Sequence, residues 1–316
     1  MTKAAADEFH LPPVPAAFKR YLRIGTCSWK YDSWKGLVYD RGKTYRPEDY
    51  LADYARHFNS VEIDQWFYSL FPGGARLPEP RTVREYAEAV PDDFIFTVKA
   101  PNSLTLTHFY KKESAHHGMF AGRENPHFLS RELLVRFLEA LAPLGKKLGP
   151  IMFQFEYLNR EKMPSREAFY ERFGDFISAA PQGPAYAVEI RNPNYLVPDF
   201  FDFLGRHGLG FVYLEGSYLP PIGEVFAKHK PRTASFQIVR LLSGGGRTEV
   251  ENETRGIWDK ITQPKPAAID AAAGIAIANK RKRIVTYVDI SNEFEGSAPL
   301  TAAAFLGKLG GGSPIR

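Results

Sequence analysis

Charged or amide side chains stand inside or directly after six short apolar segments of this chain. They are Glu62, Lys99, Gln154, Glu189 with Arg191, Arg240, and Asn292. A charge within an apolar strand is costly unless it is paired or hydrogen-bonded. We therefore expect these side chains to converge on one pocket and to satisfy one another or a ligand. A structural network of ion pairs without catalysis is the alternative.

Two of these carboxylates suggest acid–base chemistry. Glu62 and Glu189 could divide the roles of general acid and general base if their surroundings push their pKa values apart. Salt bridges to Lys99 and Arg191 are the equal alternative. Arg191 and Arg240 suit a carboxylate or phosphate group on a ligand, because a guanidinium group binds such groups through two parallel hydrogen bonds.

Lys99 could form a Schiff base, since a buried lysine can lose its proton and become a nucleophile. A neighbouring carboxylate would keep the amine charged, so the sequence favours an assisting catalytic role for Lys99. Trp29 and Tyr68 could form a wall of the pocket and stack on a ligand. Packing in the core is the alternative for both aromatic residues.

The histidines His108, His116, His117 and His127 raise the possibility of a metal site. The adjacent pair His116-His117 lies in a polar stretch without a ligand spacing such as His-x-x-x-His. We therefore predict no metal and no cofactor, and we assign His108 an assisting catalytic role. Cys27 is the single cysteine of the chain, which excludes an intrachain disulfide.

Short apolar, β-branched runs alternate with stretches whose apolar residues recur every three or four positions. The predicted strands are residues 21–26, 60–63, 94–99, 150–155, 185–190, 210–213, 234–241 and 284–290. Helices are predicted over residues 47–58, 82–89, 131–141, 166–179, 197–206, 266–279 and 300–309. No clear helix is predicted after the strand at 210–213.

This alternation predicts an α/β protein with a single eight-stranded (β/α)8 TIM barrel. Parallel pairing follows because short hairpin turns are absent and each crossover is long. An open, doubly wound sheet is less favoured, because Ile24-Gly25-Thr26-Cys27-Ser28 lacks the glycine spacing of a dinucleotide fingerprint. The predicted organisation is an N-terminal extension (1–20), the barrel (21–309) and a flexible tail (310–316). Residues 102–126 and 243–253 read as insertions on the face where ligands bind.

The composition is that of an ordinary globular protein, with 44% hydrophobic and 24% charged residues among 316. The 41 Lys and Arg residues exceed the 36 Asp and Glu residues only mildly. This balance favours a small anionic ligand over nucleic acid as the partner.

The first residues lack the apolar core of a secretion signal and no stretch is typical of a membrane helix, so we expect a cytoplasmic location without membrane contact. The sequence does not reveal the oligomeric state.

A series of motifs resembles the YecE-like family, also called domain of unknown function seventy-two. The matching motifs, in family order, are Ile24 to Gly36, Val61-Glu62-Ile63 with Phe67-Tyr68, Phe96 to Pro101 with Thr107-His108, Leu148-Gly149-Pro150 with Phe153-Gln154, Glu189 to Pro193, Arg240, and Asn292 with Glu295-Gly296 and Ala298-Pro299. The resemblance covers residues 23 to 309 and implies a β/α barrel, but the family lends no settled reaction. The chain departs from the family pattern at Ser28, Asp64, Glu156-Tyr157, Asn192 and Ser291, which puts the ligand preference in doubt.

These observations favour an enzyme that applies acid–base chemistry to a small polar substrate, carbohydrate-like or phosphorylated. A metal-dependent repair nuclease acting on nucleic acid is one alternative, although the chain is weak in both a basic groove and metal-ligand spacing. A protein that binds a ligand without catalysis is the other alternative. A fold shared with other proteins does not choose among the three.

Overall fold

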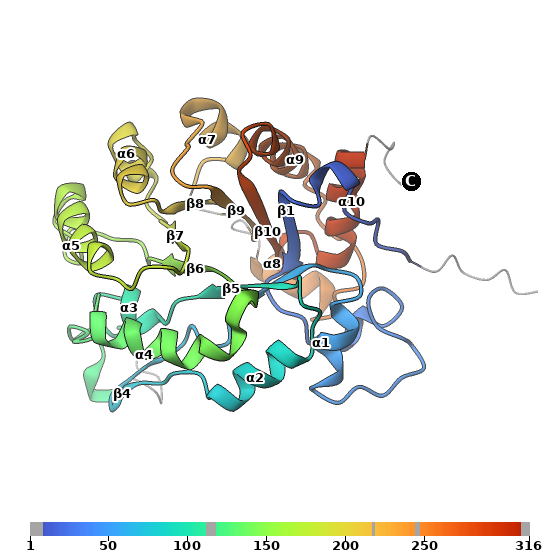
Figure 1. The fold of residues 1–316 in the computed structure, drawn as a ribbon, viewed down its shortest axis with the longest axis horizontal. Coiled ribbons are helices and arrows are strands. Elements are labelled where there is room, and N and C mark those ends of the chain that lie inside the picture. The colour runs from blue at the N-terminus through green and yellow to red at the C-terminus, as the bar shows by residue number, and fades with distance from the viewer. Residues whose placement is uncertain (1–8, 112–117, 217–218, 244–246, 311–316) are drawn as a thin grey trace, which may run out of the picture.

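Eight parallel strands in chain order form the centre of the computed structural model, which describes residues 9–111, 118–216, 219–243 and 247–310 (Figure 1). The sheet has the order β1-β10-β9-β8-β7-β6-β5-β2, so each strand lies beside its neighbours in the sequence. Its strands are β1 (Leu22–Thr26), β2 (Ser60–Ile63), β5 (Ile95–Lys99), β6 (Leu148–Gln154), β7 (Tyr186–Glu189), β8 (Gly210–Glu215), β9 (Phe236–Leu241) and β10 (Val285–Ile290). The predicted barrel architecture and all eight predicted strands are confirmed, with small differences at the strand ends.

Helices surround the strands, as Figure 1 shows. They are α1 (Asp49–Tyr54), α2 (Pro80–Glu88), α3 (Asn102–Thr105), α4 (Arg131–Leu141), α5 (Arg166–Ser178), α6 (Pro198–Arg206), α7 (Ile222–His229), α8 (Arg247–Thr254), α9 (Pro266–Arg281) and α10 (Ala298–Gly310). Ser130 and Ser165 begin α4 and α5 as N-caps, because their side chains accept hydrogen bonds from Leu133 N and Ala168 N. No helix in the described ranges has the length and apolar character needed to cross a membrane.

Two local predictions were wrong. Helix α7 follows β8, where no helix was expected; it is short, and Gly223 weakens the periodic pattern on which the prediction depended. A hairpin of β3 (Leu70–Phe71) and β4 (Gly74–Ala75) also forms, although no hairpin was expected. Two residues per strand are too few for a period to show in the sequence.

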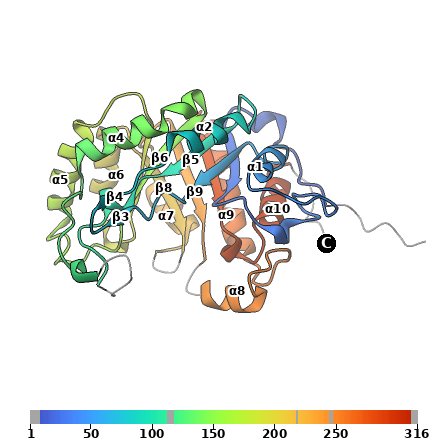
Figure 2. The same ribbon diagram turned by 90° about the horizontal axis from the view of Figure 1, so that it is seen from below.

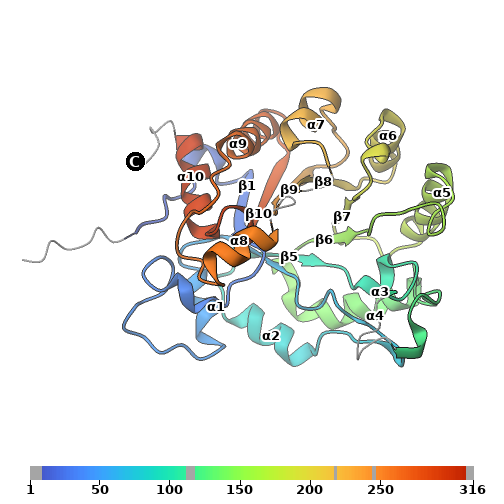
Figure 3. The same ribbon diagram turned by 180° about the vertical axis from the view of Figure 1, so that it is seen from behind.

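The segments read as insertions contain short helices. Helix α3 begins at Asn102, directly after β5, and α8 follows β9. Figure 2 shows α8 beyond the ends of the strands, and in Figure 3 it lies in front of them. Because α8 follows a strand, it belongs to the face where barrel enzymes bind their ligands.

Alternating side chains divide the strands between two apolar clusters. Met152, Ala187, Val212, Phe236 and Ile238 form a small cluster of their own, while their neighbours along the strands join the larger core that packs on the helices. Successive side chains of a strand point to opposite faces, so the small cluster fills the barrel interior. The barrel therefore has an apolar floor beneath the charged residues at the strand ends.

Side chains close the ring between β1 and β2, which share no backbone ladder among the described strand pairs. The amide of Asn59 accepts a hydrogen bond from Ile24 N (2.8 Å) and donates one to the carbonyl oxygen of Leu22 (3.2 Å). The approach is close at Gly25, where an added Cβ would lie 2.1 Å from the carbonyl oxygen of Ser60. Only glycine fits that position without a shift of β1 or β2.

Candidate functional site

The charged side chains at the carboxyl ends of β2 and β7 form two levels, one buried and one partly exposed. Glu62 on β2 and Glu189 on β7 are completely buried. Asp64 and Arg191 stand two residues further along the same two chain segments and are only partly buried. Asp64 directly follows the last residue of β2 and Arg191 stands two residues after the last residue of β7, so they form an outer level at the carboxyl ends of the strands.

Arg240 joins the two buried glutamates. Its Nε and Nη2 donate to the two carboxylate oxygens of Glu62 at 2.7 and 2.8 Å. Its Nη1 donates to Glu189 and, at 3.4 Å, to the side-chain oxygen of Gln154. The guanidinium group is 2% exposed and is bonded at all three nitrogens, so its fork is occupied by protein oxygens.

Arg191 approaches Glu189 from the other side. Its Nε donates to Oε1 of Glu189 at 3.1 Å, and its side chain is 36% exposed. Neither Nη group donates a hydrogen bond to a described residue. Arg191 therefore keeps a guanidinium edge for a carboxylate or phosphate, whereas Arg240 does not.

Neighbouring positive charges keep Glu189 ionised. Burial alone would raise the pKa of Glu189, but the positive charges of Arg240, Arg191 and Lys99 outweigh burial and lower it. The same pairing acts on Arg240: burial opposes its charge, yet Glu62 and Glu189 raise its pKa well above the usual range. Glu189 is consequently a poor proton donor at neutral pH.

Asp64 has the opposite character. Burial and then the negative charge of Glu62 raise its pKa to about 6, while Lys99 and Arg240 act against this rise. A carboxyl group with such a pKa can both give and take a proton near neutral pH. The sequence analysis missed Asp64 as a candidate and noted it only as a departure from the family pattern. The sequence Glu62-Ile63-Asp64, which brings a second carboxylate to the end of β2, was the available signal.

Lys99 at the end of β5 has no hydrogen-bonding or ion-pair partner among the described residues. It is 8% exposed, and its Nζ lies 4.4 Å from the centre of the Phe67 ring. Burial and then the charge of Arg240 lower the pKa of Lys99, although Glu62, Glu189 and Asp64 act to raise it. The lysine that the sequence placed at this pocket therefore carries a perturbed amine.

A second buried acid lies beside the glutamates and was also missed. The Oδ2 of Asp289 on β10 accepts a hydrogen bond from the Thr97 hydroxyl of β5 at 3.1 Å. Burial and then the charge of Glu62 raise the pKa of Asp289 well above its usual range. Burial, followed by Glu62, likewise raises the pKa of the Cys27 thiol. Burial therefore disfavours the charged forms of both groups, whereas the cations around Glu189 favour its charged form.

Three other predicted site residues, Trp29, Asn292 and Tyr68, make their contacts outside the charged cluster. Trp29 is buried and packs edge-on against Tyr86, with 5.1 Å between ring centres. Asn292 accepts hydrogen bonds from Trp34 Nε1 (3.2 Å) and Ala298 N (3.0 Å), so it ties loops together. Tyr68 is 70% exposed and packs edge-on against Phe67, with 5.1 Å between ring centres.

His108 lines a neighbouring cavity of about 280 Å³ together with Glu156 and Lys162. Its ring is hydrogen-bonded to the Thr107 hydroxyl at 2.9 Å, and Glu156 pairs with Lys162. No contact joins His108 to Glu62 or Glu189 within the described residues. His116 and His117 lie outside the described residues, and the described part of the chain contains no cluster of His, Cys, Asp and Glu that could hold a metal ion.

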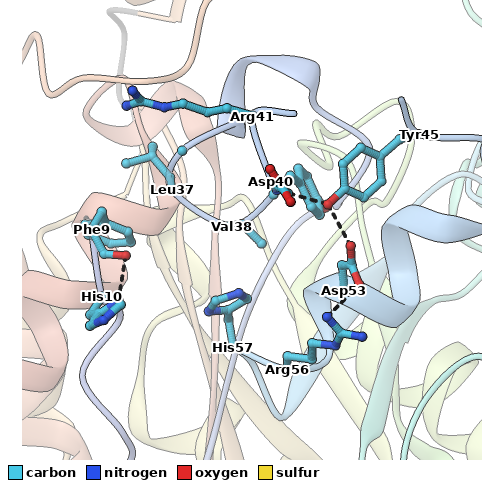
Figure 4. A pocket seen from close by; sticks show the side chains of 12 residues that line it. Phe9, His10, Leu37, Val38, Asp40, Arg41, Tyr45, Asp53, Arg56 and His57 are labelled. Atoms are coloured by element: carbon cyan, nitrogen blue, oxygen red, sulfur yellow. Dashed lines mark hydrogen bonds and ion pairs between the residues drawn. The ribbon is translucent and has the colours of Figure 1, made fainter. Parts of the chain in front are cut away.

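A larger cavity of about 580 Å³ lies apart from the charged cluster (Figure 4). Phe9 and His10 form one side, and His57 and Arg56 of the segment after α1 form another. Arg56 pairs with Asp53 at 3.2 Å. None of the predicted catalytic or ligand-binding residues lines it.

The comparisons with known proteins agree with this architecture. The family model described as "Protein of unknown function DUF72" matches residues 23–314. The chain is 27% identical over 175 residues to the UPF0759 protein YecE of Escherichia coli strain K12, a match over 55% of this chain and 50% of the relative. The chain thus matches about half the length of that curated relative.

Two solved structures have a similar fold. A DUF72 family protein of Thermotoga maritima has a TM-score of 0.62 and 21% identity, covering 90% of this chain and 97% of that one. A DUF72 family protein of Enterococcus faecalis has a TM-score of 0.62 and 18% identity, covering 93% and 98%. Similarity at this level of identity extends to the fold alone.

Proposed function

The chain belongs to the family of unknown function DUF72, whose description names no reaction, and we propose from its site that it is an acid–base enzyme for a small anionic substrate. The observation that carries this proposal is the outer level of charge at the barrel opening. There a carboxyl group with a pKa of about 6, Asp64, accompanies a half-exposed Arg191 with unused Nη groups. Proton transfer and anion binding are thus available on one face.

Arg191 supplies the binding step. A phosphate or carboxylate group that bridges its two Nη groups is held at the opening, next to the residues of the outer level. Glu189 fixes the guanidinium group through Nε, so little side-chain freedom is lost when the anion binds. A polar, carbohydrate-like body attached to the anion would then face Asp64 and Lys99.

Asp64 supplies the proton step. In this proposal the buried glutamates, which the sequence suggested as acid and base, instead hold the two arginines in place. Glu62 also keeps the pKa of Asp64 high, because its negative charge disfavours a second ionised carboxylate nearby. Asp64 is then present in both protonation states at physiological pH, as a general acid or base requires.

The test is a thermal-shift screen of sugar phosphates, nucleotides, neutral sugars and organic acids, with and without chelator. A ligand at about a hundred times its dissociation constant stabilises the folded protein by roughly 2.7 kcal/mol, which is a shift of several degrees for a chain of this size. We expect phosphorylated or carboxylated compounds to produce shifts that survive chelation. Shifts only from neutral sugars would contradict the anion site.

Catalysis is tested separately on each compound that binds. Its conversion is followed by proton NMR with the wild-type protein and with Asp64→Asn, which keeps the shape of the side chain and removes the titrating group. We expect Asp64→Asn to lower turnover far more than binding. Binding without turnover by the wild-type protein would instead identify a ligand-binding protein.

A further inference from the structure

Lys99 differs from an ordinary buried lysine in what surrounds its amine. Lysine is rarely buried unless its charge is paired. In the described parts of the chain the Nζ of Lys99 makes no hydrogen bond or ion pair, and it lies over the Phe67 ring, 4.4 Å from its centre. The sequence argument against amine chemistry rested on a carboxylate beside Lys99. In the structure Glu62 and Glu189 are paired with arginines, and no carboxylate of the described residues forms an ion pair with Lys99.

The electrostatic surroundings favour loss of the proton from Lys99. Its pKa is lowered, first by burial and then by the nearby charge of Arg240. A larger fraction of neutral amine is therefore present than on a surface lysine at the same pH. A lysine desolvated next to another cation is the kind that enzymes use as a nucleophile.

Its position completes the argument. Lys99 is the last residue of β5, at the strand end that faces ligands, and the charges of Asp64 and Glu189 both act on it. Arg191 is paired with Glu189, so an anion on Arg191 brings the rest of its molecule toward the amine. From this arrangement we propose that Lys99 forms an imine with an anionic aldehyde or ketone, an inference that rests on the proposed function and specifies its substrate class.

The reaction balances with groups already present. The lone pair of the neutral Lys99 Nζ forms the C–N bond, while the π electrons of the carbonyl move to its oxygen, which takes a proton from the Asp64 carboxyl. The Asp64 carboxylate then removes a proton from nitrogen and returns it to the hydroxyl group, which leaves as water when the C=N bond forms. Overall, the neutral amine, the carbonyl group and the protonated Asp64 carboxyl give a protonated imine, one water and the Asp64 carboxylate, without oxidation or reduction.

A structural role for Lys99 would give different behaviour. An ammonium group held only by a cation–π contact with the Phe67 ring could be replaced by arginine. Lys99→Arg keeps the charge and this contact but lacks a nucleophilic amine. The variant therefore separates the nucleophile from the cation.

The experiment uses pyridoxal 5′-phosphate as an anionic aldehyde, with sodium cyanoborohydride to trap imines on the full chain at pH 7.5. Peptide mass spectrometry then compares labelling of Lys99 with that of Lys308, whose side chain is 39% exposed and paired with Asp270. We expect Lys99 to be labelled about tenfold faster or more, because an anion held beside the amine raises the effective concentration of the aldehyde. Excess inorganic phosphate should slow labelling of Lys99 and leave that of Lys308 unchanged.

The controls separate the two proposals. Lys99→Arg should lose the imine absorbance of the bound probe while keeping the thermal shift caused by inorganic phosphate. A phosphate shift in the wild-type protein, with Lys99 labelled no faster than Lys308, would overturn the imine and leave the anion site standing. Absence of any phosphate shift would contradict the anion site itself. The wild-type labelling map decides the matter even if the variant folds poorly.

Discussion

Arg240 on β9 binds Glu62 on β2 through two hydrogen bonds, of 2.7 and 2.8 Å, across the inside of the barrel. The two strands are not neighbours in the sheet, so the pair spans the interior above the apolar floor. Glu189 accepts from the third nitrogen of the same guanidinium group. One buried cation therefore sets the positions of two carboxylates that come from distant parts of the chain.

Removing Arg240 should destabilise the fold strongly. Arg240→Met has a similar volume but leaves Glu62 and Glu189 buried without a counter-charge, which costs about 3–5 kcal/mol when a buried pair loses one partner. Urea unfolding measures the change. Arg81→Ala, which breaks the exposed pair with Glu85 (2.9 Å), is the control and should change stability by less than about 0.5 kcal/mol. Equal small losses in both variants would contradict a central role for Arg240.

The close approach of β1 and β2 at Gly25 predicts that alanine substitution at two glycines changes stability in opposite directions. Gly25→Ala would bring a Cβ to 2.1 Å from the carbonyl oxygen of Ser60 and should cost about 3 kcal/mol, at the upper end for overpacking. Gly274→Ala in α9 meets nothing within 4 Å and should stabilise by up to about 1 kcal/mol through helix propensity. Thermal unfolding of both variants checks this, and a neutral Gly25→Ala would show that the approach of β1 and β2 is looser than described.

Asp64 should make stability depend on pH. Its folded-state pKa of about 6 exceeds the ordinary value of 3.8, so the folded protein binds more protons between these values and loses stability as the pH rises through that window. Asp64→Asn removes this loss. We expect the variant to be more stable than the wild-type protein at pH 7.5, with a gap that shrinks below pH 5. Parallel urea midpoints for the two proteins across this range would exclude the raised pKa.

Glu189 contributes to stability in the opposite direction. Its folded-state pKa is lowered from 4.5, so its contribution is present above that value and is lost as the pH falls through the lower, folded-state pKa. Glu189→Gln should therefore destabilise at pH 7 and weaken the acid dependence of unfolding. Acid titrations followed by circular dichroism measure both effects. An unchanged acid transition would mean that Glu189 is not held by Arg240 and Arg191.

The barrel could be predicted from the sequence because each of its strands carries its own apolar run and each crossover is long. Helix α7 could not, since its eight residues include Gly223 and the pattern is short. Glu62, Glu189, Arg191 and Arg240 stood out because charge within apolar strands is rare. Their separate roles could not be predicted, because a sequence shows no distances. Only the structure shows that the guanidinium group of Arg240 is occupied and that Glu62 raises the pKa of Asp64.

His108 and Asn292 show that the contacts of loop residues could not be predicted from the sequence. Both follow strands, as site residues of a barrel do, but residues after a strand can also bind their own loops. Asn292 holds Trp34 and Ala298, and His108 turns to Thr107. Loop conformation depends on contacts between distant segments, which a single sequence does not reveal.

The measurement that tests the central claim most directly is a calorimetric titration of inorganic phosphate into the wild-type protein and into Arg191→Met. The account predicts that the wild-type protein binds phosphate, that chelator does not abolish binding, and that Arg191→Met weakens it at least about tenfold, since a charge-assisted hydrogen bond contributes roughly 1.5–3 kcal/mol. Thermal unfolding without ligand checks that Arg191→Met is folded. Equal phosphate affinity in the two proteins would contradict an anion site at Arg191 and, with it, the proposed function.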